Sequence, residues 1–219
     1  MIDGAAQRRT AILDSIAGAA KTARRDRQDV QLIAVTKGRS TAEIEPLIAA
    51  GQRDFGENRV QEARAKWAPL LERHPEVRLH EIGQLQSNKA AEAASLFSTI
   101  HSVDRPSLLD ALDKVSNGAG TRPSIYLQVN IGEEPQKGGC AIDDLETLVT
   151  AARETRLDLL GLMAIPPLGV EPAPYFALLA KLARANGLTG LSMGMSSDYR
   201  QAVMLGATAV RIGTALLED

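Results

Sequence analysis

The chain has 219 residues and a formal net charge of −2, and 44% of its residues are hydrophobic. These values are typical of a globular domain with one sizeable core, and they give no electrostatic reason to expect nucleic acid or a membrane surface as a partner. The single cysteine, Cys140, excludes an intrachain disulfide, and the sequence has no long apolar run or signal-type N-terminus. We therefore expect one domain over residues 1–219, in the cytoplasm.

Helices and strands alternate in the predicted first half of the chain. An Ala-rich amphipathic helix over residues 5–25 precedes a buried strand that begins at Leu32 and stops at Lys37. Further strands are predicted at residues 53–55, 78–82 and 97–101, with helices between Ser40 and Gly51, over 58–72, and beginning near 87 and 104.

The second half of the chain repeats this alternation. Strands are predicted at residues 124–129, 157–163, 190–192 and 209–212, and helices at 142–155, 173–186 and 198–205. Gly187 is well suited to end the helix at 173–186. Turns of small residues, Gly194-Met195-Ser196-Ser197 and Gly213-Thr214, follow the last two strands.

Eight strands, each followed by helical sequence except at the end, predict the fold class. Strict alternation favours a parallel sheet, and eight units favour a closed barrel over an open sheet. Few residues follow the eighth strand, so we expect the N-terminal helix to cover the gap where a full eighth helix would pack. The prediction is an α/β fold, a single (β/α)8 barrel of the TIM type with an extra N-terminal helix.

Lys37 stands where the first predicted strand ends. Functional sites of (β/α)8 barrels lie at the carboxyl ends of the strands. A lysine in a pocket there is desolvated, which lowers the pKa of its amine, and a neutral amine condenses with an aldehyde to a Schiff base. The alternative, a lysine that merely extends from the strand end into water, stays open at this point.

The turns after the seventh and eighth strands predict a phosphate site. Ser196 and Thr214 offer hydroxyl groups, and the flexible backbone around Met195 and Gly213 offers N–H donors near helix starts. The first and eighth strands of a closed barrel are neighbours. Lys37 is therefore expected beside both turns, although it lies far from them in the sequence.

Each candidate also has a purely structural interpretation. Asn58 can cap a helix together with Gln61, and Ser196 can cap the helix that follows it. Gly213 can serve only the turn, and Arg211 can pair with an acid on a neighbouring loop.

Other kinds of site find little support in the sequence. His74, His80 and His101 lack the spacing of metal ligands, so no metal site is predicted. Cys140 lies in a Gly-rich loop without a base partner, and no nucleotide-binding or serine-hydrolase motif is present.

Six segments carry a resemblance to a known family across nearly the whole chain: Ala34–Lys37, Phe55–Glu62, His80–Lys89, Gly161–Pro166, Leu191–Ser196 and Val210–Ala215. In this order they are similar to the pyridoxal phosphate homeostasis protein family, also known as the proline synthase co-transcribed bacterial homologues. The segment Thr36–Ser40 and the short tail Ala215–Asp219 depart from the usual pattern, but the lysine is kept.

The resemblance implies a fold, a cofactor and a set of contacts. The fold resembles the barrel domain of alanine racemase and bacterial ornithine decarboxylase, and the cofactor is pyridoxal 5'-phosphate (PLP). The implied cofactor-binding residues are Lys37 as the internal aldimine, Ser196, Gly213 and Thr214 at the phosphate, Asn58 at the ring or hydroxyl side, Arg211 at the pyridine nitrogen, and Met195 in the same turn as Ser196.

These contacts favour a carrier over an enzyme. An arginine facing the pyridine nitrogen keeps it unprotonated and weakens the ring as an electron sink. Racemases add an acid/base residue from another domain or subunit, and we expect none here. We predict a PLP homeostasis protein without catalysis of its own, a monomer or weak dimer that hands PLP to apo PLP-dependent enzymes. The alternatives are a minimal PLP-dependent amino-acid racemase or decarboxylase, and a cofactor-free Schiff-base aldolase.

Overall fold

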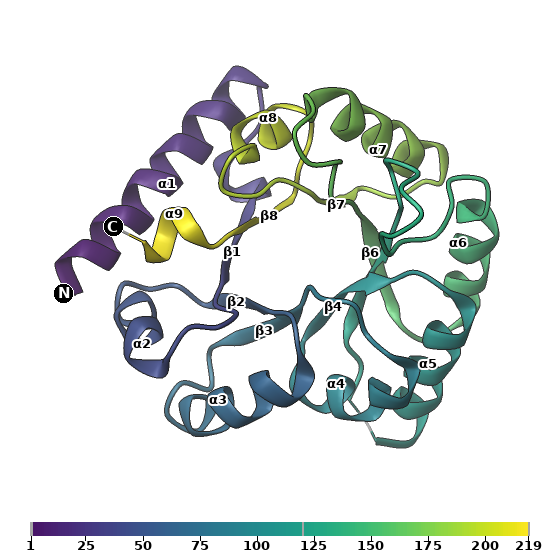
Figure 1. The fold of residues 1–219 in the computed structure, drawn as a ribbon, viewed down its shortest axis with the longest axis horizontal. Coiled ribbons are helices and arrows are strands. Elements are labelled where there is room, and N and C mark those ends of the chain that lie inside the picture. The colour runs from purple at the N-terminus through teal and green to yellow at the C-terminus, as the bar shows by residue number, and fades with distance from the viewer. Residues whose placement is uncertain (1, 120, 219) are drawn as a thin grey trace.

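The computed structural model describes residues 2–119 and 121–218. Met1, Gly120 and Asp219 lie outside the described residues, and so do both ends of the predicted 1–219 domain. Figure 1 shows strands around a central axis and helices around the strands. No helix within the described ranges is long and apolar enough to cross a membrane.

The strands form a closed parallel barrel in the order β1 to β8, which confirms the predicted (β/α)8 fold. They are β1 (Gln31–Val35), β2 (Asp54–Glu57), β3 (Arg78–Glu81), β4 (Thr99–Val103), β5 (Ser124–Gln128), β6 (Asp158–Met163), β7 (Gly190–Ser192) and β8 (Ala209–Ile212). Strand β1 pairs with β8, and Ile33 lies opposite Arg211. This pairing places segments from the two ends of the chain side by side.

The outer layer consists of helices, of which α1 and η1 precede the first strand and the others follow strands. They are α1 (Ile2–Thr22), α2 (Thr41–Ala49), α3 (Val60–Arg73), α4 (Ala90–Leu96), α5 (Pro106–Ala119), α6 (Leu145–Glu154), α7 (Ala173–Ala185), α8 (Tyr199–Met204) and α9 (Thr214–Leu217), with 3-10 helices η1 (Arg27–Asp29) and η2 (Ser87–Lys89). Helix α1 contacts α8, α9 and α2, as Figure 1 shows. The N-terminal helix therefore covers the gap beside the short α9, as expected.

Several element boundaries differ from the prediction by one or two residues. Strands β2 and β4 extend beyond the predicted ranges, to Glu57 and Val103, because both run into the buried carboxyl end of the barrel. Phe97 is not part of β4. Its backbone N–H donates a hydrogen bond to the carbonyl of Ala93 and so ends α4, and its side chain packs in the core. The helix predicted to begin near Ser87 is a 3-10 turn followed by α4.

The barrel wall separates an apolar layer from a more polar interior. Outside the wall, the ring of Phe55 on β2 packs against Trp67 on α3 with centroids 4.8 Å apart, and both are fully buried. Inside, side chains of β3, β4, β7 and β8 hydrogen-bond to one another across the barrel, among them His80, His101 and Ser192. Polar groups therefore lie directly beneath the carboxyl end of the barrel.

Candidate functional site

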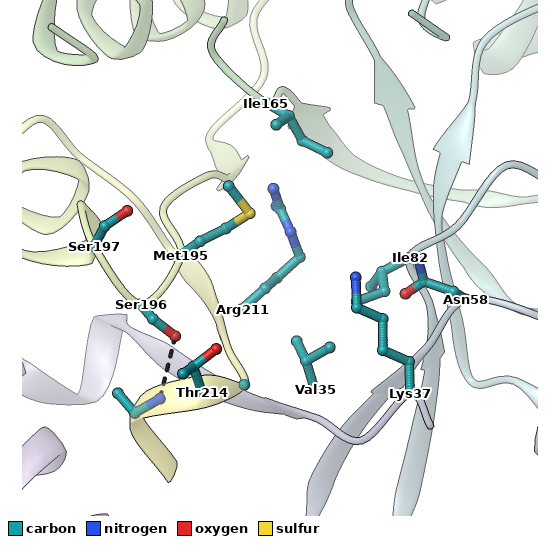
Figure 2. A pocket seen from close by; sticks show the side chains of 12 residues that line it. Val35, Lys37, Asn58, Ile82, Ile165, Met195, Ser196, Ser197, Arg211 and Thr214 are labelled. Atoms are coloured by element: carbon teal, nitrogen blue, oxygen red, sulfur yellow. Dashed lines mark hydrogen bonds between the residues drawn. The ribbon is translucent and has the colours of Figure 1, made fainter. Parts of the chain in front are cut away.

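A cavity of about 590 Å³ opens at the carboxyl end of the barrel. It is lined by Val35, Lys37, Asn58, Ile82, Ile165, Met195, Ser196, Ser197, Arg211, Gly213, Thr214 and Ala215. All seven predicted site residues are in this set. In Figure 2, Lys37 and Asn58 lie on one side of the cavity, and Ser196, Ser197 and Thr214 lie on the other.

Lys37 lies at the rim of this cavity, in the turn after β1. The strand itself ends at Val35, so the predicted strand end is two residues too late. Lys37 is exposed, which corrects the expectation of a lysine enclosed in a pocket. Its amine has no hydrogen-bond or ion-pair partner among the described residues, and it points toward the cavity in Figure 2. The amine is therefore available to a ligand.

The turn that carries Lys37 is anchored by a buried carboxylate on β2. Oε1 of Glu57 accepts hydrogen bonds from Oγ1 of Thr36 at 2.6 Å and from Nε1 of Trp67 at 2.8 Å. The ammonium of Lys66 lies 2.8 Å from the same oxygen and donates to the carbonyl of Thr36 at 2.7 Å. Glu57 is fully buried, so these contacts hold the backbone before Lys37 rigidly against α3.

The turn after β7 depends on a glycine in the left-handed region. Gly194 has φ of +95°, and a Cβ there would lie 2.5 Å from Cβ of Ala202 and 3.0 Å from Cα of Tyr199. The turn is closed by the N–H of Met195, which donates to Oδ1 of Asp198 at 2.6 Å. A glycine at position 194 thus lets the backbone of this turn pass close to α8.

Ser196 and the start of α9 lie next to each other. Helix α8 begins at Tyr199 with Asp198 at its N-cap, so Ser196 does not cap that helix. Instead, Oγ of Ser196 lies 3.5 Å from the N–H of Ala215, as drawn in Figure 2. Helix α9 begins at Thr214, and N–H groups of a first helical turn lack partners within the helix. Hydroxyl and N–H donors from both predicted turns therefore meet at one side of the cavity.

Arg211 points from the barrel interior into the cavity. It is 4% exposed, and its NH1 group donates to Oγ of Ser192 at 2.6 Å while NH2 donates to the carbonyl of Ala164 at 3.1 Å. The proposed pairing with a loop acid is therefore wrong, since both of these acceptors are neutral. Burial lowers the pKa of Arg211 to about 10, which leaves the side chain cationic at neutral pH.

Asn58 does not cap a helix either. Helix α3 begins at Val60 with Arg59 at its N-cap, and no side chain bonds the first turn there. Oδ1 of Asn58 is buried and accepts no hydrogen bond from the described residues. A buried polar atom without a partner is costly, so this oxygen is a candidate ligand contact.

The sequence interpretation missed five lining residues. Ile82 and Ile165 follow β3 and β6 and supply apolar surface, together with Val35 at the end of β1. Ser197 and Ala215 flank residues that were predicted, and the same turns could have indicated them. The apolar residues carried no such signal, because isoleucine and valine at strand ends are also typical of a core.

The chemistry of the lining is restricted. Lys37 and Arg211 are the titratable side chains among the described residues that line the cavity. No group of three His, Cys, Asp or Glu residues in the described parts of the chain could hold a metal ion. The arrangement suits an anionic ligand that can also react with an amine.

The fold and the site define a class of protein, which the comparisons with known proteins identify. A family model described as the N-terminal domain of alanine racemase matches residues 12–219. An alanine racemase from Clostridium difficile is 13% identical with a TM-score of 0.72, over 98% of this chain and 56% of that one, and this likeness concerns the fold alone. The class is the alanine racemase type of barrel.

Closer relatives define the family within this class. The pyridoxal phosphate homeostasis protein of Pseudomonas aeruginosa is 44% identical over 205 residues, which is 90% of this chain and 88% of the relative. The structure of PipY from Synechococcus elongatus with PLP bound is 41% identical, with a TM-score of 0.82 over 92% of this chain and 99% of that one. The chain belongs to the pyridoxal phosphate homeostasis protein family, which confirms the resemblance seen in its sequence.

Proposed function

We propose that this protein binds PLP, takes part in intracellular PLP homeostasis, and carries the cofactor as a Schiff base on Lys37 without catalysis of its own. The observation that carries the proposal is the facing arrangement of a free amine and a set of hydroxyl and N–H donors across one cavity of about 590 Å³. The names of the curated relatives and the PLP bound to PipY support it.

The donor set fits the parts of PLP. Ser196 and Thr214, with the backbone at Met195 and Gly213, would hold the phosphate, because hydroxyl and helix-start N–H groups bind such anions. A Cβ at Gly213 would meet no described atom closer than 3.4 Å, so packing does not demand a glycine there. Close approach of a ligand to the backbone would explain it.

The remaining contacts orient the ring. Arg211 is cationic and donates hydrogen bonds but cannot accept them, so it would donate to the pyridine nitrogen and keep it unprotonated. The unpartnered Oδ1 of Asn58 would accept a hydrogen bond at the ring or hydroxyl side. When bound, PLP supplies an aldehyde that condenses with an amine and a ring that withdraws electrons.

Two features of the site favour a carrier over a racemase or decarboxylase. An unprotonated pyridine nitrogen makes the ring a weaker electron sink. In addition, the described lining residues include no acid, histidine, tyrosine or cysteine that could exchange a proton with a substrate carbon. The exposure of Lys37 leaves the cofactor accessible for transfer. We propose apo PLP-dependent enzymes in the cytoplasm as recipients, and a monomer or weak dimer as the carrier.

Reductive trapping tests where the cofactor is attached. The wild-type protein, Lys37→Ala and Lys181→Ala, an exposed lysine on α7, are each incubated with PLP, reduced with borohydride and digested for peptide mass spectrometry. We expect one stoichiometric pyridoxyl group on Lys37 in the wild type and in Lys181→Ala, and none in Lys37→Ala. No adduct in the wild type, or an equal spread over other lysines, would refute the proposal.

A second measurement tests the absence of catalysis. The PLP-loaded wild type is incubated with individual L-amino acids, and the products are separated by chiral chromatography. We expect no racemisation or decarboxylation above the rate of free PLP. Turnover that depends on Lys37 would replace the carrier with the enzyme alternative.

A further inference from the structure

A row of buried polar side chains runs from the cavity down through the barrel. NH1 of Arg211 lies 2.6 Å from Oγ of Ser192, which lies 2.8 Å from Nδ1 of His101. Nε2 of His101 lies 3.0 Å from Nδ1 of His80, and Nε2 of His80 lies 3.1 Å from Oδ1 of Asp54. All five residues are buried. The histidines had been considered only as metal ligands, yet two of them meet inside the barrel.

The Asp54 end of the row is a fixed acceptor. Arg78 binds both oxygens of Asp54, from Nε at 2.7 Å and from NH2 at 2.8 Å. Burial by itself would raise the pKa of Asp54, but the hydrogen bonds from His80 and Arg78 lower it to about 2. Asp54 is therefore ionised at neutral pH and can only accept hydrogen bonds.

The two ends together favour one order of donors along the row. Arg211 can only donate, so the hydroxyl oxygen of Ser192 accepts a hydrogen bond from it. The O–H of Ser192 then donates a hydrogen bond to Nδ1 of His101, its other polar neighbour among the described residues. His101 then carries its proton on Nε2 and donates to His80, which donates from its own Nε2 to Asp54. In this order both imidazoles are neutral, with the proton on Nε2.

The surroundings of His101 agree with a neutral ring. Burial lowers the pKa of His101 well below its usual value, and the nearby charge of Arg211 acts in the same direction. Its ring stacks on Tyr126 with centroids 4.6 Å apart and an interplanar angle of 18°. The ring is thereby held in the orientation that presents Nδ1 to Ser192.

We propose that His101, acting through Ser192, is a positioning residue for Arg211. The row binds NH1 on the inner side of the guanidinium, and the carbonyl of Ala164 binds NH2. The guanidinium is then oriented toward the cavity, and its hydrogen bonds within the described residues are to neutral acceptors. This proposal extends the proposed function and rests on it, because the position of Arg211 matters only if Arg211 faces the bound cofactor.

Nuclear magnetic resonance of the protein without cofactor tests the direction of the row. The sequence contains three histidines, so ¹⁵N-histidine labelling gives a simple spectrum in which His74 serves as the internal reference. We expect the Nε2–H tautomer for His80 and His101, with a scalar coupling between Nε2 of His101 and Nδ1 of His80. A cationic His101, or a proton on its Nδ1, would overturn the inference whether or not PLP binds.

Titration of PLP into the same wild-type sample tests the connection to the cofactor. We expect the Nδ1 resonance of His101 to shift in proportion to saturation, while His74 stays unchanged. If reductive trapping shows PLP on Lys37 and His101 does not respond at saturation, the positioning proposal fails and the proposed function stands. If PLP does not bind, the proposed function fails, and the positioning proposal fails with it.

Two variants remove the contact, and a third controls for the loss of a buried hydroxyl. Ser192→Ala removes the link, and His101→Phe keeps a ring against Tyr126 but removes the acceptor. Ser116→Ala deletes a buried hydroxyl that has no partner in the described structure. We expect about a tenfold weaker PLP affinity and an altered pH profile of the bound cofactor's absorbance in the first two. Wild-type values in a folded Ser192→Ala would overturn the proposal.

Discussion

Replacing Glu81 by glutamine should make the protein more stable at neutral pH. Glu81 is the last residue of β3, is 1% exposed, and lies opposite Glu57 on β2. Burial raises the pKa of Glu81 to about 8, and the charge of Glu57 acts in the same direction. The N–H of Gly83 donates a hydrogen bond to Oε1 of Glu81 at 3.0 Å and opposes this shift. The folded protein therefore keeps Glu81 protonated at pH 7.

The free-energy cost of keeping Glu81 protonated at neutral pH follows from its pKa values in the unfolded and folded states. In the unfolded chain the carboxyl group ionises near pH 4.5, whereas in the folded protein it ionises near 8. Between these values the folded state binds more protons, so the free energy of unfolding decreases as the pH rises. At about 1.4 kcal/mol per pH unit, the stability that Glu81 costs the folded protein at pH 7 is at most about 3.4 kcal/mol.

Glutamine keeps the shape and the acceptor for Gly83 but cannot ionise. The difference in stability between Glu81→Gln and the wild type should therefore be smallest near pH 5, rise toward pH 8 and then level off. Urea denaturation of both proteins at pH 5, 6, 7 and 8 measures it, and Glu72→Gln, at an exposed position on α3, is the matched control. A difference that does not change with pH would refute the reasoning.

Two further substitutions test the turns at the cavity. Gly194→Ala should lower the free energy of unfolding by about 2–4 kcal/mol, because the new Cβ would lie 2.5 Å from Cβ of Ala202 at a residue with φ of +95°. Urea denaturation measures this loss, and a loss below about 1 kcal/mol would contradict this description of the turn. Thr214→Val should weaken PLP binding about three- to tenfold and leave the binding of pyridoxal, which lacks the phosphate, unchanged. Equal losses for both ligands in fluorescence titrations would place Thr214 away from the phosphate.

Several features of the fold could be predicted because they depend on local sequence. Apolar runs of strand length, helical periodicity and turn residues such as Gly187 depend on neighbours within a few positions. Their regular alternation was sufficient to predict eight parallel strands and the barrel. The predicted boundaries failed where long-range contacts decide them. Phe97 belongs by composition to a strand, but in the structure it ends α4 and packs in the core.

The candidate site was predictable for a related reason. Closing a barrel brings all strand ends together, so Lys37, Ser196 and Gly213 could be placed at one rim from the strand count alone. The alternative roles of Asn58 and Ser196 as helix caps could not be settled that way. They were excluded only when the structure showed that the helices begin at Val60 and Tyr199.

The amino-acid sequence by itself thus determined the barrel, its family and seven of the twelve residues that line the cavity. Only the tertiary structure decided what supports those residues: the anchoring of the Lys37 turn by Glu57, and the row from Arg211 through Ser192 and His101. Such contacts join residues on different strands, and side-chain pairing across a barrel leaves no periodic pattern along the chain. The physical reason is that hydrogen bonds and burial depend on distances in space, and these distances are set when the sheet closes, not by separation along the sequence.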